Sequence, residues 1–470
     1  MNNKNLFFYS TIAISSALFL IRILFISNTM LVDDEAYYAM YGRHLSWGYI
    51  DHGPVVALII WLFTLLYESS FTVRLGSVFL MTLTTFIVYY YGKLIFNYKT
   101  ALALSIVITA NLMFHTNSII ITPDVPLAFF TINAIIFYYL AFFKNKKYIY
   151  FGGLMLGAAV LSKVSAIFPA IGIFLFPFLV KDMRSWIKNI HFYNSFILSF
   201  VVFLPFVIWN FQNDFAFVKY QGSHIMEGGS LNDFVELWAG VALVIGPLYF
   251  FYSAIKPLLN VFKWRHISVE SKYFTMVTVV PLMYFIMQSI FSRLELNWVA
   301  PIFSGGLFLL GLEINSKKST TKSFKFQIGY SIILIFLIMV QTVYPILPVK
   351  GKADPTNRYF MYSNLINDTK RLLYEKPDLA KLRIVSNEFQ IPSMINFYVN
   401  PAQEAICLSI DYHETLYSFL YNQRDLIGND FIYIHDKKTF PDKLKTYFDS
   451  YELILNSEQF RNNSTVSMFS

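Results

Sequence analysis

Long apolar segments separated by short polar ones fill the first three quarters of the chain. A helix that spans a membrane needs about 20 apolar residues. The segments that approach or reach this length are 7–28, 72–92, 101–121, 125–143, 148–163, 165–180, 192–210, 234–255, 273–291, 299–314 and 326–346. The pattern predicts a polytopic α-helical membrane protein with about 11 transmembrane helices.

A further apolar run, 55–66, is too short to span and follows Gly53 and Pro54. It predicts a helix that lies in the interface or re-enters the membrane. If this run does not span the membrane and the N-terminus lies inside, the predicted inner loops hold seventeen Lys and Arg residues. The outer loops before the tail then hold five. Basic residues favour the inner side, so the count supports this topology. Carboxylates gather on the opposite side, among them Asp34 and Asp124, which indicates a site there.

The composition changes after Pro348. Residues 349–470 are polar, with β-rich runs at 382–386, 405–410, 431–435 and 452–455. Helical stretches are predicted between them at 357–375, 391–398, 413–424 and 440–449. This alternation predicts a soluble α/β domain. We therefore expect a transmembrane domain over 1–348, with a catalytic outer loop at 29–70, and an extracytoplasmic α/β domain over 349–470.

The composition excludes several classes of protein. Hydrophobic residues make up 56% of the chain and charged residues 14%, against about 25% charged in soluble domains. The net charge of +8 does not indicate nucleic-acid binding, because the basic residues follow the predicted inner loops. A single cysteine, Cys407, excludes an intrachain disulfide and a cysteine-based zinc site. The sequence has no phosphate-binding Gly-rich loop, HExxH or G-x-S-x-G motif, so we expect no nucleotide-driven pump.

The densest polar cluster lies in the first predicted outer loop, 31–54. Asp33, Asp34 and Glu35 follow the first span directly, and Asp51 and His52 come later in the same loop. Adjacent carboxylates repel one another, so a purely structural loop gains little from them. They could also mark the start of a helix, where acidic residues are favourable. The nearby second polar pair favours a functional site.

Four more polar positions or segments interrupt the apolar pattern, three of them at the outer face. Asp124 follows Thr122 and Pro123, and could either cap the next helix or act in a site. Lys163 lies where basic residues are disfavoured, so it needs an anionic partner such as a lipid phosphate, unless it snorkels. Arg22 in the first span is a similar but weaker case. The segment 292–298 gathers Arg293, Glu295 and Asn297 in one short loop; it also contains Trp298.

Five motifs in order resemble a known family. They are DDEAYY (33–38), GYIDHGP (48–54), ITPDVPLAFF (121–130), GLMLGAAVLSKVSAIFP (153–169) and LNWVAP (296–301). Together they resemble the bacterial branch of the GT-C glycosyltransferases, which is similar to the protein O-mannosyltransferases and the lipid A aminoarabinose transferase. The resemblance covers the membrane part of the chain.

The resemblance implies a polyprenyl-phosphate sugar donor, transfer that is usually inverting, and catalytic acidic residues at Asp34 and Asp124. The aminoarabinose transferases carry a Lys where this chain has His52, and an Arg where it has Tyr37. These departures weaken the case for aminoarabinose and lipid A specificity. Glycosyl transfer through an oxocarbenium-like centre needs a carboxylate to act as base or to stabilise positive charge, and cations to hold the leaving phosphate.

Each candidate residue therefore has an expected role. The catalytic candidates are Asp34, Glu35 and Asp124. The candidates for binding the donor phosphate are Lys163, His52, Arg43 and Arg293. The candidates for binding substrate are Asp33, Tyr37, Asp51, Glu295 and Asn297. No cofactor is required, although a divalent metal at Asp34 and Asp124 is possible.

The sequence thus predicts an integral membrane glycosyltransferase of the bacterial inner membrane, with its site and its C-terminal domain on the periplasmic side. It is expected to move a sugar from an undecaprenyl-phosphate-type donor to lipid A, another glycolipid or a protein. A transporter or flippase of lipid-linked sugars is the alternative, since intramembrane charges also mark transport paths. A non-catalytic membrane scaffold is the third candidate.

Overall fold

The computed structural model describes residues 3–225, 228–317, 322–349, 353–410, 413–435, 440–459 and 464–469. The chain divides into two compact units. The membrane unit consists of Met1–Ser27, Ser46–Ile59 and Arg74–Phe336. The loop–tail unit consists of Asn28–Leu45, Ile60–Val73 and Leu337–Ser470. The second unit therefore combines most of the first predicted outer loop with the C-terminal tail.

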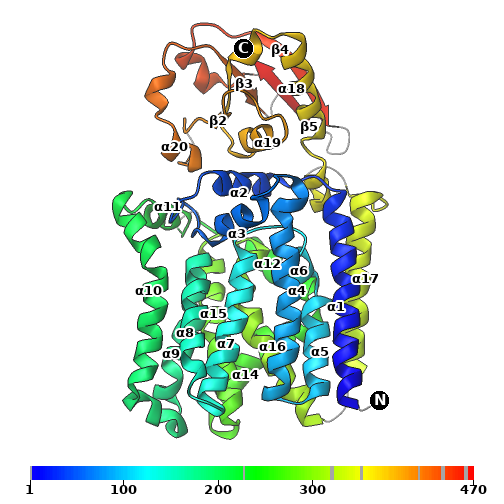
Figure 1. Cartoon of the computed structure of the whole chain (residues 1–470), viewed down its shortest axis with the longest axis vertical. Helices are drawn as coiled ribbons and strands as arrows, with labels where there is room; N and C mark the ends of the chain where they lie inside the picture. The colour runs from blue at the N-terminus through cyan, green and yellow to red at the C-terminus, as the bar shows by residue number, and fades with distance from the viewer. Residues whose placement is uncertain are drawn as a thin grey trace. The chain divides into compact units, whose positions relative to one another are not determined.

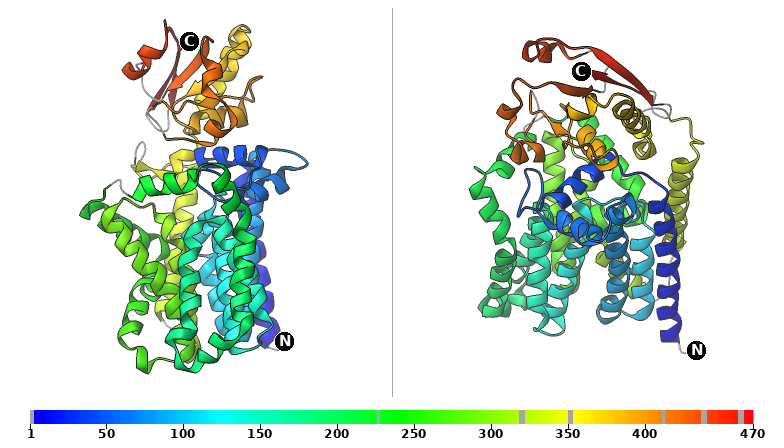
Figure 2. Two further views of the ribbon diagram at one scale, coloured as in Figure 1. Left: turned by 90° about the vertical axis from the view of Figure 1, so that its left-hand side faces the viewer. Right: turned by 45° about the horizontal axis from the view of Figure 1, so that its top comes forward.

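The membrane unit is a bundle of helices whose long members run side by side (Figure 1, Figure 2). Its longest helices are α1 (Asn3–Ser27), α4 (Ser70–Ile95), α7 (Asp124–Phe143), α10 (Ile190–Gln212), α15 (Val269–Phe291), α16 (Ala300–Lys317) and α17 (Lys322–Val343). The shorter α-helices are α3 (Val55–Thr64), α5 (Tyr98–Thr109), α6 (Leu112–Thr116), α8 (Tyr148–Ser162), α9 (Ile167–Leu179), α11 (Ala216–Ile225), α12 (Leu231–Ile245), α13 (Pro247–Phe250) and α14 (Lys256–Phe262). Short 3-10 or π helices are η1 (Val164–Ala166), η2 (Lys181–Lys188), η3 (Phe251–Ile255), η4 (Trp264–His266) and η5 (Leu296–Val299).

The predicted spans correspond one by one to these helices. In the described residues, 7 helices are long and apolar enough to cross a membrane, and the number rises to 9 if each of two bent helix pairs is one span. The shorter apolar helices α5 and α8 occupy the two remaining predicted spans, 101–121 and 148–163. The prediction of a polytopic helical membrane protein is confirmed, and α3 is a separate helix of 10 residues.

Helix α7 lies at the centre of the bundle. In its most apolar window 94% of the residues are buried, whereas α1, α10 and α17 are only 22–28% buried and have the exposure expected of lipid-facing helices. Gly153 and Gly157 bring α8 close to the main chain of α10, because a Cβ atom at either glycine would meet the carbonyl oxygen of Ser195 or Ser199 within 2.7 Å. Small residues four apart permit such close helix packing in membranes. The Ser199 hydroxyl also donates to the Gly153 carbonyl at 2.7 Å.

A sharp break at Gly246 separates α12 from the helices that follow, with a bend of 119°. Gly246 has a φ of +83°, and Pro247 cannot donate a main-chain hydrogen bond. The released Ile245 carbonyl accepts from the side-chain amides of Asn111 and Gln327, both at 2.9 Å. These bonds satisfy polar main-chain atoms at a place where a lipid environment offers no water.

Arg22 is buried in the membrane unit, with 1% of its surface exposed. Its Nη2 donates to the carbonyl oxygen of Thr109 at 3.0 Å and to the Thr109 hydroxyl at 3.2 Å. Thr109 ends α5, where helix carbonyls lack partners and the helix dipole favours a cation. Arg22 therefore caps a helix end and, of the two alternatives, does not snorkel outward.

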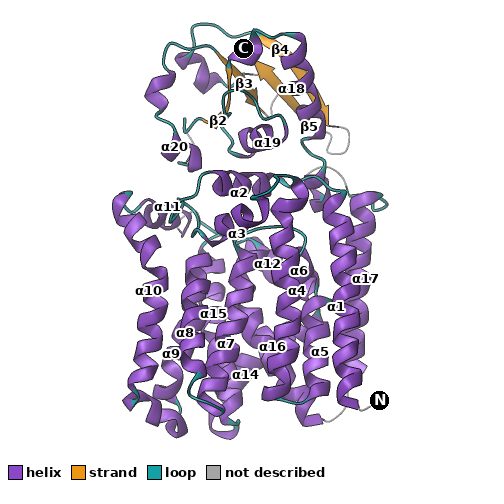
Figure 3. Ribbon diagram, viewed as in Figure 1, coloured by secondary structure: helices purple, strands orange, loops and turns teal. Residues whose placement is uncertain are grey.

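The loop–tail unit holds α2 (Asp33–Arg43) and a small α/β fold, to which the strands of the described chain are confined (Figure 3). Its other helices are η7 (Pro355–Tyr359), α18 (Ser363–Glu375), η8 (Leu379–Lys381), α19 (Gln390–Tyr398), α20 (Leu416–Leu420), η9 (Gln423–Leu426) and η10 (Asp442–Tyr447). The strands are β1 (Arg383–Ser386), β2 (Ile406–Cys407), β3 (Phe431–His435), β4 (Leu453–Gln459) and β5 (Ser464–Phe469).

The strands form one sheet in the order β2-β1-β3-β5-β4. The β1 strand pairs in parallel with β2 and β3, and β5 pairs antiparallel with β3 and β4. Strands form at all four predicted β-rich runs, and β5 was not predicted. The expected small α/β unit is therefore observed, although the predicted helix at 440–449 is only a 3-10 helix, η10.

Candidate active site

Three predicted residues meet in the membrane unit. The Lys163 ammonium donates to Asp124 Oδ1 at 2.7 Å, and the Asn297 amide donates to Asp124 Oδ2 at 2.6 Å. The Asp124 and Lys163 side chains are only 2% and 13% exposed. A buried carboxylate is stable only if it is paired and hydrogen-bonded, and both of its oxygens meet that condition here. Asp124 is thus the anionic partner that Lys163 was expected to need.

The chain brings these residues together from three helix ends. Asp124 is the first residue of α7, where acidic side chains are favourable. Lys163 follows α8 with extended main-chain angles, which ends the helix, and Asn297 lies in η5, just before α16. Gly53 brings in the first loop, because a Cβ atom there would lie 1.8 Å from the Leu161 carbonyl oxygen. Only glycine allows the loop to approach the end of α8 so closely.

A cavity of about 270 Å³ opens beside Lys163. The polar residues that line it are Asp51, His52, Lys163, Ser165, Gln221, Gln288 and Ser292. The apolar and aromatic residues that line it are Val164, Ile167, Phe168, Phe217, Tyr284, Phe285, Leu294 and Trp298. A cavity lined by a cation and amide donors as well as by aromatic side chains suits a ligand with a polar head and an apolar tail.

His52 is neutral in this cavity. Burial lowers the pKa of its imidazole well below the usual value, and the nearby Lys163 ammonium lowers it further. A neutral imidazole has one N–H donor, so His52 can donate one hydrogen bond to a phosphate but adds no positive charge. The charge for holding an anion in this cavity must come from Lys163.

A second cluster lies within the loop–tail unit. Arg358 Nε donates to Asp33 Oδ1 at 2.9 Å, and Arg358 Nη2 donates to the same oxygen and to Asp34 Oδ2, the latter at 2.6 Å. Burial raises the pKa of Asp33, and the neighbouring Asp34 carboxylate raises it further. Although burial alone would lower it, the two carboxylates raise the pKa of Arg358 above its usual value, so Arg358 remains charged.

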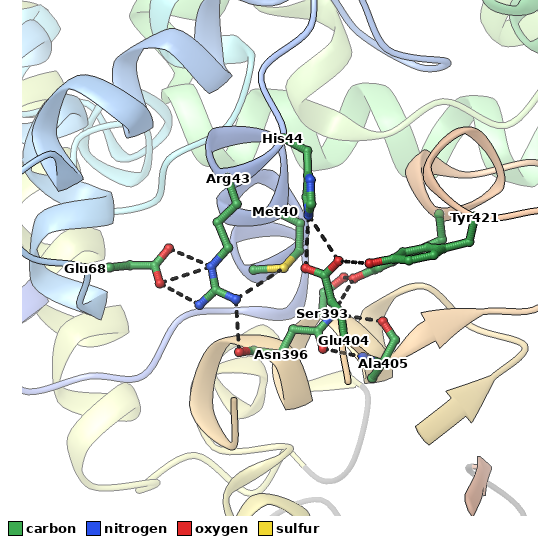
Figure 4. A network of polar contacts seen from close by, with 10 residues as sticks. Met40, Arg43, His44, Glu68, Ser393, Asn396, Glu404, Ala405 and Tyr421 are labelled. Atoms are coloured by element: carbon green, nitrogen blue, oxygen red, sulfur yellow. Dashed lines mark hydrogen bonds and ion pairs between the residues drawn. The ribbon is translucent and has the colours of Figure 1, made fainter. Parts of the chain in front are cut away.

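The other first-loop candidates also have protein partners. Glu35 is fully buried, and its carboxylate accepts the Val32 N–H at 2.9 Å, so it caps the start of α2. The Tyr37 hydroxyl accepts the Leu416 N–H at 2.9 Å. Arg43 donates through Nε and Nη2 to Glu68, with a shortest distance of 2.5 Å, and through Nη1 to the Asn396 carbonyl at 3.2 Å (Figure 4). Structural roles are therefore evident for these residues, and their expected functional roles stay predictions.

Next to Arg43, His44 contacts the C-terminal fold. Its Nε2 lies 3.0 Å from a Glu404 carboxylate oxygen, and the Tyr421 hydroxyl donates to the same carboxylate (Figure 4). Burial alone would raise the pKa of Glu404, but the hydrogen bonds from His44 and Tyr421 lower it overall. Arg43 and His44 thus join α2 to α19 and the segment before β2.

The remaining candidates divide between the cavity and the surface. Asp51 lines the cavity, and its carbonyl accepts from the Gln221 amide at 3.3 Å. Arg293 and Glu295 are exposed, and neither lines the cavity. The described residues contain no group of three or more His, Cys, Asp or Glu side chains that could hold a metal ion. A metal at Asp34 and Asp124 remains an expectation from the sequence.

Arg358, Gln221 and Gln288 were not predicted. Gln288 is a polar residue near the end of an apolar span, which is a signal that could have found it. Arg358 lies among other polar residues of the tail, where nothing in the sequence distinguishes it.

Comparisons with known proteins agree with this architecture. Residues 51–209 match the family model described as dolichyl-phosphate-mannose-protein mannosyltransferase. This match covers Asp51, His52, Asp124 and Lys163. No curated protein matches the sequence.

Two solved structures resemble the whole chain. The crystal structure of ArnT from Cupriavidus metallidurans bound to undecaprenyl phosphate has a TM-score of 0.68 at 14% sequence identity, covering 98% of this chain and 97% of that chain. The apo state of the same protein has a TM-score of 0.65 at 14% identity, with the same coverage. At this identity the likeness shows the fold.

The chain has the GT-C-type fold of ArnT. The fold extends over nearly all of it, and the mannosyltransferase family match lies in the membrane part. The predicted fold class is therefore confirmed, and the family match over residues 51–209 agrees with the predicted resemblance. The glycosyltransferase activity belongs to the proposal that follows. The donor, the acceptor and the orientation in the membrane are matters for proposal.

Proposed function

We propose that this chain is a GT-C glycosyltransferase that transfers a sugar from an undecaprenyl-phosphate-type donor to a hydroxyl or phosphate of an envelope acceptor. The observation that carries the proposal is the cavity beside Lys163, which is lined by a cation and amides and also by aromatic side chains. A polyprenyl phosphate likewise combines an anionic head with an apolar tail. Undecaprenyl phosphate bound to ArnT, which has the same fold, supports this assignment.

The donor phosphate is proposed to bind at Lys163. The ammonium has three donors, and its single recorded hydrogen bond is the one to Asp124. His52 and the amides of Gln221 and Gln288 line the same cavity and supply neutral donors. Because the leaving group is already a phosphate, the transfer needs neither nucleotide nor ATP.

Asp34 is proposed as the base or charge stabiliser of the reaction. The acceptor oxygen attacks the anomeric carbon as the bond from that carbon to the phosphate oxygen breaks. The hydroxyl proton passes to Asp34, and the polyprenyl phosphate leaves with its negative charge. If the acceptor is a phosphate, no proton needs removal and Asp34 only stabilises the positive charge. The resemblance of residues 33–38 to the first-loop motif of the GT-C glycosyltransferases supports this role.

The donor assignment is tested by binding of undecaprenyl phosphate alone, so the sugar need not be known. Lys163→Met should weaken binding by at least about tenfold, because the cavity loses its cation, an effect of about 1.4 kcal/mol or more. The matched control is Lys219→Met, which removes an exposed lysine of the same unit. Equal binding by the wild type and K163M would refute the donor site.

Mass spectrometry of envelope lipids and glycoproteins, with and without the protein, tests the acceptor. A hexose, hexosamine or pentose lost from lipid A, another glycolipid or a protein would identify both sugar and acceptor. The alternative of a sugar-lipid transporter predicts that purified protein in detergent transfers no sugar to any acceptor. The GT-C fold and the mannosyltransferase family match favour the enzyme.

The proposed location is the bacterial inner membrane, with the site on the periplasmic side. Single cysteines at position 34 and at the exposed position 295, in a Cys407→Ser background, should both react with a membrane-impermeant thiol reagent added to spheroplasts. Reaction of the two cysteines from opposite sides of the membrane would refute this location.

A further inference from the structure

Asp34 is held through only one of its two carboxylate oxygens. Oδ2 accepts from Arg358 Nη2 at 2.6 Å, and among the described residues no hydrogen bond to Oδ1 is recorded. The Asp34 side chain is 38% exposed. One oxygen is thus fixed by the protein, and the other can accept a hydrogen bond from a substrate.

Arg358 is itself fixed from two sides. Asp33, whose side chain is only 11% exposed, accepts from Nε and Nη2. The turn that carries Arg358 is capped by Asp354, whose carboxylate accepts from the Thr356 N–H at 2.9 Å and from the Gln341 amide of α17 at 2.6 Å. The guanidinium is therefore a pre-positioned group.

Asp33, Arg358 and Asp34 are arranged like a catalytic base and the groups that orient it. A catalytic base is commonly held by a third group that fixes its direction and its charge. Here Asp33 anchors Arg358, and Arg358 orients Asp34. An arginine suits this place because its planar fork can reach two carboxylates at once, which the single ammonium of lysine cannot do as well.

We propose that Arg358 is a positioning residue for the glycosyl transfer, which holds Asp34 Oδ2 so that Oδ1 faces the acceptor. The C-terminal part of the chain thereby supplies a residue that contacts Asp34. This inference rests on the proposed role of Asp34. It adds a residue outside the membrane unit and outside the five motifs of the sequence.

The test compares Arg358→Ala, Arg358→Lys and Asp34→Asn in steady-state transfer by the full-length protein in detergent. A misplaced catalytic group can reduce the rate on the order of 10²-fold, so R358A should lower kcat by about that factor. The KM for the donor should change little. R358K should recover part of kcat, and added guanidinium chloride should restore R358A but not D34N.

Folding is controlled by two further variants. R358A leaves buried Asp33 without its cation, which could unfold the protein, so the double variant D33N/R358A removes that charge as well. It should elute and melt like the wild type and still have a low kcat that guanidinium raises. Arg371→Ala, which removes an exposed arginine paired with Asp368 in the same unit, should leave kcat unchanged.

The outcomes separate the two proposals. If D34N retains full activity, the role proposed for Asp34 is wrong. If D34N is inactive while R358A has the kcat of the wild type, the role of Asp34 stands and the inference about Arg358 is refuted. The inference is also refuted if R358A and D33N/R358A lose activity through kcat and KM together, and if neither R358K nor added guanidinium restores that activity.

Discussion

The ion pair between Asp124 and Lys163 allows folding and catalysis to be separated. Both side chains are largely buried, at 2% and 13% exposure, and they meet at 2.7 Å. Removing one partner of a buried pair leaves an uncompensated charge and costs about 3–5 kcal/mol, whereas replacing both is often neutral. We therefore expect Lys163→Met and Asp124→Asn each to lose about 3 kcal/mol or more, and D124N/K163M to recover most of that loss.

The assay is equilibrium unfolding in mixed detergent micelles, with Lys219→Met as the control. The coupling energy of the four-variant cycle should be at least about 2 kcal/mol. Transfer activity should stay low in K163M and also in the double variant, because the donor cavity has lost its cation in both. Single variants within about 0.5 kcal/mol of the wild type, the range of ordinary surface changes, would show that the pair is not desolvated and would refute this reasoning.

Three further predictions concern neighbouring residues. Asn297→Ala removes the 2.6 Å hydrogen bond to Asp124 and should cost about 1.5–3 kcal/mol and lower kcat; an unfolding free energy equal to that of the wild type would contradict it. Burial and Lys163 lower the pKa of His52 in the folded protein. The contribution of neutral His52 to the free energy of unfolding is therefore fully present above about pH 6.5, and it is lost as the pH falls toward the lowered pKa. The unfolding free energy of His52→Gln should therefore fall less steeply below pH 6.5 than that of the wild type, by up to about 1.4 kcal/mol per pH unit, and equal slopes would exclude the effect. Gly53→Ala would place its Cβ atom against the Leu161 carbonyl and should cost at least about 1–3 kcal/mol, whereas Gly329→Ala, with nothing within 4 Å, should melt like the wild type.

The helices of the membrane unit could be predicted because lipid imposes a simple rule on sequence. Each predicted span became a helix or a bent pair of helices. Spans 101–121 and 234–255 are interrupted, at Ala110 and Gly246. Their interruptions depend on distant side chains such as Arg22 and Gln327, which hydropathy does not register.

The candidate site was predictable where carboxylates and cations interrupt the apolar pattern. Asp124, Lys163 and Asn297 were each singled out, but their mutual contact was not, because it depends on how α7, α8 and η5 pack. Arg358 had no distinguishing signal in a polar tail. Glu35 caps the start of α2, and its expected catalytic role stays a prediction.

The hydrogen bonds at the Ile245 carbonyl limit how the protein can move. A broken helix is commonly a hinge. At this break, however, the side-chain amides of Asn111 and Gln327 donate to the carbonyl, and Gln327 also accepts the Leu248 N–H at 3.0 Å. Bending there would break several hydrogen bonds where no water can replace them. The break between α12 and α13 is therefore rigid, and any opening that admits a lipid must occur elsewhere in the bundle.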